Sequence, residues 1–311
     1  MSGRRVRIAI IGDVHEVWDA DIDRRALESL EVDLTLFVGD FGEQKVELVQ
    51  AVSELPVPKA VILGNHDAWL PFGPKKEDGI DGVQQQLDLL GECHVGYGRL
   101  DFPDLQLSVV GGRPFSSGGT DWESSAAYSK KRYGYTSFDE SARAIAQQAL
   151  AAPRDDTLIV MAHNGPTGLG DRPEDICGRD FGRPAGGDYG DPDLQIALDL
   201  VRAAGRDVPL VTFGHMHQIL AHGKGERKLL VNNPSTGTVY LNTAIVPRVK
   251  DVWSGQDDEG SPVKCRDCRN FFVVEMEDSR VRSVQELWVS VSPGEKPACI
   301  VSRQELLIET V

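Results

Sequence analysis

The sequence predicts an α/β fold in which parallel strands alternate with helices. Short apolar runs, the kind that form buried parallel strands, recur along the first two-thirds of the chain, and segments with helical spacing lie between them. A chain of 311 residues with 41% hydrophobic content can bury a large core without dividing into separate units. We therefore expect a single domain over residues 1–311.

The elements follow in a regular order. Unbroken apolar runs predict strands at 6–11, 34–38, 60–63, 105–110, 157–161 and 210–213. Polar or Ala- and Gln-rich segments with helical spacing predict helices at 21–31, 43–54, 83–90, 137–151 and 193–204. Alternating runs then predict mostly antiparallel strands of a second sheet at 228–231, 239–244, 271–277 and 284–291.

Polar residues of a restricted kind follow the predicted strands. Five of the seven histidines fall in four short stretches, with Gly39-Asp40 between the first two. These stretches are Asp13-Val14-His15, Gly64-Asn65-His66-Asp67, Met161-Ala162-His163-Asn164 and Gly214-His215-Met216-His217. Any one of them alone is typical of a polar loop. Five blocks at strand ends are poorly explained by coincidence, and together they can hold two metal ions.

Two neighbouring divalent ions must share a ligand, and the two oxygens of a carboxylate allow this. Asp40 is the natural bridge. One ion can then take Asp13, His15 and His217, and the other can take Asn65, His163 and His215. Neutral imidazoles favour manganese, iron or zinc, whereas magnesium is less suited to this set.

The order D-x-H, GD, GNH-D, H, GH-x-H resembles the calcineurin-like metallophosphoesterase superfamily and spans residues 13–217. The resemblance implies a four-layer αββα sandwich, with two mixed β-sheets flanked by helices, and the metal roles given above. It also implies that Asn65 and His66 face the substrate, with His66 as a charged imidazole beside the phosphate and the leaving oxygen. Asp67 would hold the ring of His66 in orientation and keep it protonated.

The reaction implied by the resemblance is hydrolysis of a phosphomonoester, carried by a small molecule or a phosphopeptide, by a metal-activated hydroxide. Two alternatives stay open. One is a phosphodiesterase acting on a cyclic nucleotide or another diester, and the other is a non-catalytic, metal-dependent binding module. Gly39-Asp40 continues as Phe41-Gly42-Glu43-Gln44, which departs from the Ser/Thr protein phosphatase pattern. Purple acid phosphatases have a tyrosine at the position of Glu43, which we interpret as the acidic first turn of a helix.

Two segments, near 112–135 and 164–192, resemble insertions that shape the substrate pocket. Arg113 is the leading candidate to bind phosphate, because a guanidinium can do so through two bonds. The alternative is an arginine in an acidic network. Weaker candidates are Arg172, Arg179 and Arg183. We interpret Lys130-Lys131-Arg132 as a solvated helix face.

Composition limits the partners. Lys and Arg total 33 against 48 Asp and Glu, and the net charge of -15 disfavours nucleic acid. The apolar run at 8–11 is too short for a signal peptide, and no run is long enough to span a membrane, so we expect a cytoplasmic protein. The cysteines are odd in number, and the role of Cys265 and Cys268 stays open, as do the oligomeric state and the natural substrate.

Overall fold

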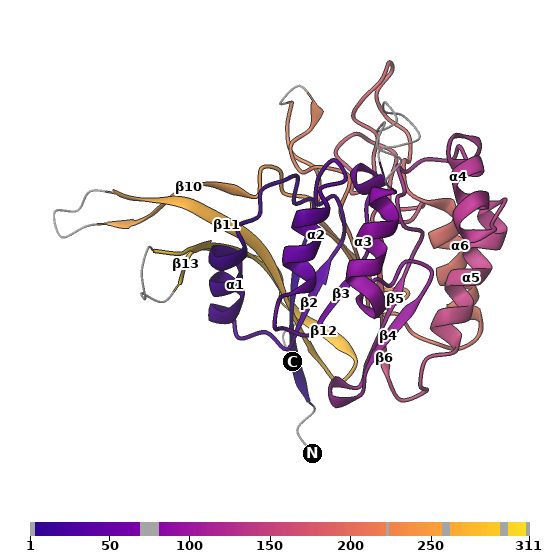
Figure 1. The fold of residues 1–311 in the computed structure, drawn as a ribbon, viewed down its shortest axis with the longest axis horizontal. Coiled ribbons are helices and arrows are strands. Elements are labelled where there is room, and N and C mark those ends of the chain that lie inside the picture. Colours follow the sequence, from indigo (N-terminus) through magenta and orange to yellow (C-terminus); the bar gives the residue numbers. More distant parts are fainter. Residues whose placement is uncertain (1–3, 69–80, 222–223, 257–261, 293–297, 309–311) are drawn as a thin grey trace.

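Two mixed β-sheets pack face to face between outer helices (Figure 1). The structure is a computed structural model that describes residues 4–68, 81–221, 224–256, 262–292 and 298–308. Hydrophobic clusters lie between the sheets and between each sheet and its helices. This is the four-layer αββα arrangement expected from the sequence.

The first sheet has the order β13-β12-β11-β1-β2-β3, and β10 also pairs with β11. Its strands are β1 (Arg5–Ile11), β2 (Leu34–Phe37), β3 (Lys59–Val61), β10 (Val249–Gln256), β11 (Pro262–Glu277), β12 (Arg280–Ser290) and β13 (Cys299–Ile308). The first three are parallel, with Ile8 opposite Leu34. The other pairings are antiparallel, and the β10–β11 pair projects from the body (Figure 1).

The second sheet has the order β4-β5-β6-β7-β9-β8. Its strands are β4 (Arg99–Phe102), β5 (Leu107–Gly111), β6 (Thr157–Met161), β7 (Leu210–Phe213), β8 (Leu230–Asn233) and β9 (Thr238–Asn242). The four central strands are parallel, and β4 and β8 pair antiparallel at the two edges.

Helices cover the outer faces. The helices are α1 (Ala20–Ser29), α2 (Val46–Ser53), α3 (Gly82–Leu90), α4 (Glu123–Tyr133), α5 (Phe138–Leu150) and α6 (Pro192–Ala203), and the short 3₁₀ turns are η1 (His66–Ala68), η2 (Gly91–Cys93) and η3 (Pro103–Leu105). The first three helices pack on the first sheet, whereas α5 and α6 pack on the second (Figure 1). A membrane crossing needs a long apolar helix, and the described part of the chain has none of that kind.

The strand β1 shows how the sequence builds these layers. Ile8 and Ile10 point between the sheets, while Ala9 and Ile11 point towards the helices, because successive side chains of a strand alternate between its faces. All four are buried, which explains why this strand reads as an unbroken apolar run.

The strands expected after residue 228 are mostly antiparallel, as predicted, but they do not belong to one second sheet. The strand β9 extends the second sheet in parallel with β7, whereas β11 and β12 extend the first sheet beyond β1. Alternation of apolar and polar residues along a strand indicates which of its faces is buried, but it does not indicate which strand it pairs with. The sequence also did not predict β4, β10 or β13. The Lys130-Lys131-Arg132 run lies in the last turn of α4, in agreement with its interpretation as a helix face.

Candidate metal centre and active site

The predicted metal ligands meet at one edge of the molecule. They follow the carboxyl ends of five parallel strands: Asp13 and His15 follow β1, Asp40 follows β2, Asn65 follows β3, His163 follows β6, and His215 and His217 follow β7. Parallel strands present these ends at the same edge of a sheet. The two sheets therefore contribute ligands from opposite sides of one site.

One group of donors combines Asp13, His15 and His217. The Nε2 atoms of the two histidines lie 3.1 Å apart, and they lie 3.9 and 3.8 Å from Asp13 Oδ1. Metal–ligand bonds of about 2.0–2.2 Å place the donors of one ion about 3–4 Å from each other, so these separations match a transition-metal site.

A second group combines Asp40, His163 and His215. Asp40 Oδ1 is 3.3 Å from His163 Nε2, which is also 2.9 Å from Asn65 Oδ1. The other nitrogen of that ring, Nδ1, lies 2.8 Å from the Val38 carbonyl and can donate to it. That bond leaves Nε2 as the ligand atom, as is common for metal-binding histidines.

Asp40 connects the two groups, because its Oδ2 lies 3.8 Å from His15 Nε2 while its Oδ1 faces His163. A third group of possible ligands, His15, Asp40 and His66, overlaps both. The donor set of carboxylate, amide and imidazole therefore fits two adjacent ions that share Asp40. None of the metal-binding groups among the described residues contains a cysteine. Cys265 and Cys268 lie on β11 as free thiols.

The carboxyl groups of the site are ionisable groups in a buried place. Burial, together with the nearby Asp40, raises the pKa of Asp13 to about 8. Burial also works against the ionisation of Asp40, but the charge and hydrogen bond of His163 outweigh it and hold the pKa of Asp40 below its usual range. Burial lowers the pKa of His215 to about 3 and that of His217 to about 4. These two rings are therefore neutral, which is the form that binds metal.

Several ligands adopt an unusual backbone conformation. Asp13, His15, Asp40 and His215 have φ angles of 46°, 43°, 55° and 67°. This left-handed region is uncommon for residues other than glycine and occurs often at functional sites. Each ligand thus turns sharply out of its strand.

Glycines before the ligands allow the close approach. A Cβ on Gly64 would overlap Asp40 Oδ1, and a Cβ on Gly214 would overlap Asp13 Oδ2. Glycine, which has no Cβ, is therefore needed at both positions.

His66 has a different partner from the one expected. Its Nδ1 lies 2.6 Å from Glu43 Oε1, and its ring meets that of His15 edge-on at 5.0 Å. Glu43 lies in the loop before α2, which begins at Val46, so its interpretation as a residue of the first helical turn was wrong. The local sign of this partner is the position of Glu43 shortly after Asp40.

Asp67 supports the backbone rather than the ring. Its two carboxylate oxygens accept hydrogen bonds from the backbone N–H groups of four residues: Asp40, Phe41, Gly42 and Gly64. The side chain is fully buried because η1 turns it into the loop that follows β2. The expected role in orienting His66 is therefore corrected: Asp67 fixes the loops that carry Asp40 and Asn65.

Arg113 is not exposed towards a substrate. It is 7% exposed, and its guanidinium pairs with Asp191 at 2.8 Å and with Asp193 at 2.9 Å. The expected phosphate contact is corrected, and the acidic network named as its alternative is what the structure shows, although the network is buried. Of the weaker candidates, Arg179 donates to the Gly186 and Pro184 carbonyls, and the other two are exposed.

Both predicted insertions reach the site. In the segment 112–135, the Ser117 carbonyl lies 3.1 Å from His215 Nε2. In the segment 164–192, Asp180 and Phe181 line a hollow that His215 and His217 also line.

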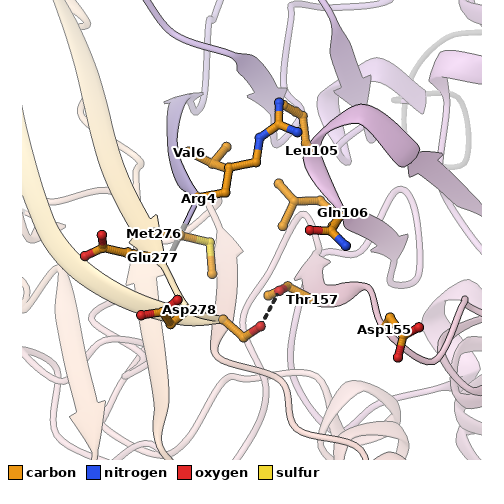
Figure 2. A pocket seen from close by; sticks show the side chains of 11 residues that line it. Arg4, Val6, Leu105, Gln106, Asp155, Thr157, Met276, Glu277 and Asp278 are labelled. Atoms are coloured by element: carbon orange, nitrogen blue, oxygen red, sulfur yellow. Dashed lines mark hydrogen bonds between the residues drawn. The ribbon is translucent and has the colours of Figure 1, made fainter. Parts of the chain in front are cut away.

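A second hollow, of about 220 Å³, lies at the opposite ends of the strands (Figure 2). It is lined by Val6 of β1, Leu107 of β5 and Thr157 of β6, and Thr157 Oγ1 forms a 2.7 Å hydrogen bond with Ser279. These are amino ends of parallel strands, whereas ligands of open α/β sheets bind at carboxyl ends. The metal donors thus mark the candidate active site.

Comparison with known protein families gives one assignment. The model of the calcineurin-like phosphoesterases matches residues 6–219, which include all the ligands above. The chain belongs to the calcineurin-like phosphoesterase family. The family is metal-dependent and hydrolyses phosphoric esters, in agreement with the donor groups of this chain. No curated protein matched the chain.

Several solved structures are similar in fold to this phosphoesterase. A structure of PhoD is 8% identical, with a TM-score of 0.51, over 100% of this chain and 73% of that one. GAP50, described as the anchor in the inner membrane complex of Plasmodium, is 14% identical with a TM-score of 0.49 over 98% and 90%. A dimetal phosphatase from Danio rerio is 10% identical with a TM-score of 0.46 over 96% and 98%. At such identities the likeness to PhoD concerns the fold alone.

Proposed function

We propose that this chain is a dinuclear metal-dependent phosphatase that hydrolyses a phosphomonoester. The observation that carries the proposal is the pair of donor groups that meet at Asp40, with His66 beside them. The hollow next to His215 and His217 has a volume of about 300 Å³, at the lower end of the range for small-molecule sites. Because this hollow has room for one organic group, it favours a phosphomonoester over a phosphodiester as the substrate.

The residues have separate tasks. Asp13, His15 and His217 would hold one ion, Asn65, His163 and His215 the other, and Asp40 both. Manganese, iron or zinc suits these donors. When bound, such ions supply Lewis acidity that polarises the phosphate and lowers the pKa of a water molecule.

His66 supplies the proton in this proposal. Its Nδ1 is held by Glu43, so Nε2 is the atom that can reach the leaving oxygen of the ester. Donation from Nε2 neutralises the charge that develops on the leaving alcohol, and general acids of this kind typically contribute about 10² to 10⁴ in rate. Asn65 lies next to His66 and can contribute its amide to the phosphate. Asp67 keeps both loops in place.

Two synthetic esters test the proposal. The protein is stripped with a chelator, reloaded with Mn²⁺, and assayed with phenyl phosphate and diphenyl phosphate. We expect hydrolysis of phenyl phosphate that depends on Mn²⁺ and little hydrolysis of the diester. Preference for the diester would assign a phosphodiesterase instead. Stoichiometric metal with turnover of neither ester would contradict catalysis and favour a metal-dependent binding module.

A further inference from the structure

The hollow next to the metal ligands has two unlike walls. Ser117, His215 and His217 form the wall that belongs to the metal site, and Phe181 and Ile219 form an apolar wall. The hollow is therefore continuous with the place where the phosphate of a substrate would lie.

The apolar wall is exposed to solvent. Phe181 is 44% exposed and Ile219 is 48% exposed, and both belong to the small set of large apolar side chains that the described part of the protein leaves open. A scattered exposed apolar residue needs no explanation, but two that line one hollow beside a metal site form a surface for an apolar ligand. The ring of Phe181 meets that of Tyr189 edge-on, with centroids 4.9 Å apart, which limits its positions.

Polar contacts fix this wall relative to the metal ligands. Asp180 Oδ2 accepts a 2.6 Å hydrogen bond from the Ala221 backbone, and its Oδ1 lies 3.1 Å from the Arg227 guanidinium. The same guanidinium donates to the His217 carbonyl at 3.1 Å. Arg227 is almost fully buried and also donates to backbone carbonyls of the preceding loop, at Pro173, Asp175 and Gly178.

The ion pair between Asp180 and Arg227 also neutralises the charge on this side of the hollow. The carboxylate of Asp180 is the one acidic side chain among the residues that line it, and Arg227 pairs with that carboxylate. Among the residues that the structure describes, the wall thus offers no unpaired charge to a substrate, and its free surface is the apolar side chains of Phe181 and Ile219. The polar groups of a sugar or a charged peptide would find no hydrogen-bond partner on the side chains of Phe181 and Ile219.

The geometry points to this hollow as the subsite for the organic part of the phosphoester, and it points to a substrate whose organic part is apolar, an aromatic ring above all. The inference rests on the proposed phosphatase function, because it names the substrate class of that same site. Phe181 and Ile219 are specificity-determining residues in this account. A flat ring can contact both while its phosphate stays beside His215 and His217.

Hydrolysis of two alkyl-type esters tests the substrate class. Benzyl phosphate and ethyl phosphate both release an alcohol of low acidity, but only benzyl phosphate carries an aromatic ring. We expect kcat/KM to be about 10- to 100-fold higher for benzyl phosphate, as for other apolar pockets. In Phe181→Ser and Ile219→Ser, this ratio should fall about 3- to 10-fold in each variant. Leu200→Ser, which removes a 40% exposed side chain on α6, is the matched control and should keep the ratio.

Binding of phosphonates separates the subsite from turnover. Benzylphosphonate and ethylphosphonate resist hydrolysis, and their Kd values for the Mn²⁺-loaded protein are measured by calorimetry. We expect benzylphosphonate to bind about 10-fold more tightly or better, and Phe181→Ser to remove that difference while the bound metal stays the same.

The outcomes are distinguishable. Tighter binding of benzylphosphonate without hydrolysis of any monoester would uphold the subsite and reject the proposed function. Equal Kd values, no measurable binding of benzylphosphonate, or a preference that survives both substitutions would overturn the subsite, even in a protein that hydrolyses phenyl phosphate.

Discussion

At the scale of single residues, the site is built from ligands that are bent out of their strands and buried. Asp13 and Asp40 combine a left-handed backbone with nearly complete burial, whereas His215 shares that backbone conformation and is half-buried. Such conformations cost about 1–3 kcal/mol each and persist only where the surrounding structure enforces them. Cations held at this site would offset the repulsion between the carboxylates of Asp13 and Asp40 and so favour this strained arrangement.

The tasks of binding metal and of donating a proton lie on different residues. We expect His66→Ala to lower kcat about 10²- to 10⁴-fold with little loss of metal, because the general acid is removed while Asp13, Asp40 and the other ligands stay. Asp40→Asn should lower both bound metal and turnover. Elemental analysis and phosphatase rates measure the two effects. His94→Asn is a matched histidine control outside the site. Equal metal loss in the His66 and Asp40 variants would contradict the separation.

Glu43 and Asp67 are both acidic neighbours of His66, and their contacts predict different defects. Glu43→Gln removes the carboxylate that faces His66 Nδ1, so kcat should fall about 10- to 100-fold with unchanged metal content. Asp67→Asn replaces an oxygen that accepts backbone N–H groups, so metal content and thermal stability should fall with activity. Measuring kcat, bound metal and Tm for both variants decides the assignment. A large loss of metal in the Glu43 variant would speak against it.

At the scale of elements, ion pairs join loops to helices around the site. Arg113, two residues after β5, pairs with Asp191 and with Asp193 at the start of α6. These carboxylates also accept hydrogen bonds from Ser116 and Ser141. The network holds the loops of both predicted insertions together, and it explains why an arginine near the metal edge is not available to a substrate.

Removing this arginine is expected to affect folding rather than substrate binding. Arg113→Met leaves two buried carboxylates without their cation, which typically destabilises a protein by about 3–5 kcal/mol. Urea unfolding measures this loss, and KM for phenyl phosphate, taken where the variant is folded, should change less than about twofold. Unchanged stability with a strongly raised KM would restore the phosphate-binding role.

His94 connects η2 to the strand β3 and is a source of acid sensitivity. Burial lowers the pKa of His94 to about 4, and its Nε2 has no hydrogen-bond partner among the described residues. Between pH 6.5, its ordinary pKa, and pH 4, the unfolded chain therefore takes up a proton that the folded protein does not. Stability falls as the pH falls through this window, by up to about 3 kcal/mol for a difference of this size.

The His94→Asn variant should lose that contribution. Its free energy of unfolding, measured by urea titration at several pH values, should fall less steeply than that of the wild type between pH 6.5 and 4. The difference between the two proteins isolates His94, because the other histidines are common to both. Parallel curves would show that His94 is accessible to protons in the folded state.

At the scale of the whole molecule, the site exists only where the two sheets meet. Each sheet supplies part of the ligands, so metal binding links the two halves of the fold and should stabilise it. At free Mn²⁺ about 100 times its Kd, the stabilisation is about 3 kcal/mol. A chelator should lower Tm by several degrees, and Mn²⁺ should restore it. Asp40→Asn is the control that should lose this dependence. An equal Tm with and without metal in the wild type would contradict the shared site.

The two segments predicted to be insertions line the space beside the metal centre. Segments 112–135 and 164–192 come from different loops, yet Ser117 of one and Phe181 of the other line the same hollow beside His215. In the proposed phosphatase, substrate selection would therefore depend on segments that surround the metal centre rather than on the metal ligands.

The sequence by itself determined which candidate metal donors this protein has and which strand ends they follow. Asp13, Asp40 and His163 could be predicted as candidate ligands because each follows an apolar run, and burial of a parallel strand leaves a clear local pattern. Gly64 and Gly214 are part of the same local sequence pattern, because the carboxylates of the site approach them too closely to allow a Cβ.

Tertiary structure alone decided which polar groups pair with one another. Glu43 rather than Asp67 faces His66, Arg113 is enclosed by Asp191 and Asp193, and β9 joins the second sheet. These outcomes depend on contacts between segments distant in sequence, and local propensity contains no information on which partner a charged side chain or a strand edge will meet. Ligands at strand ends follow from short-range pattern, whereas their neighbours follow from how the chain packs.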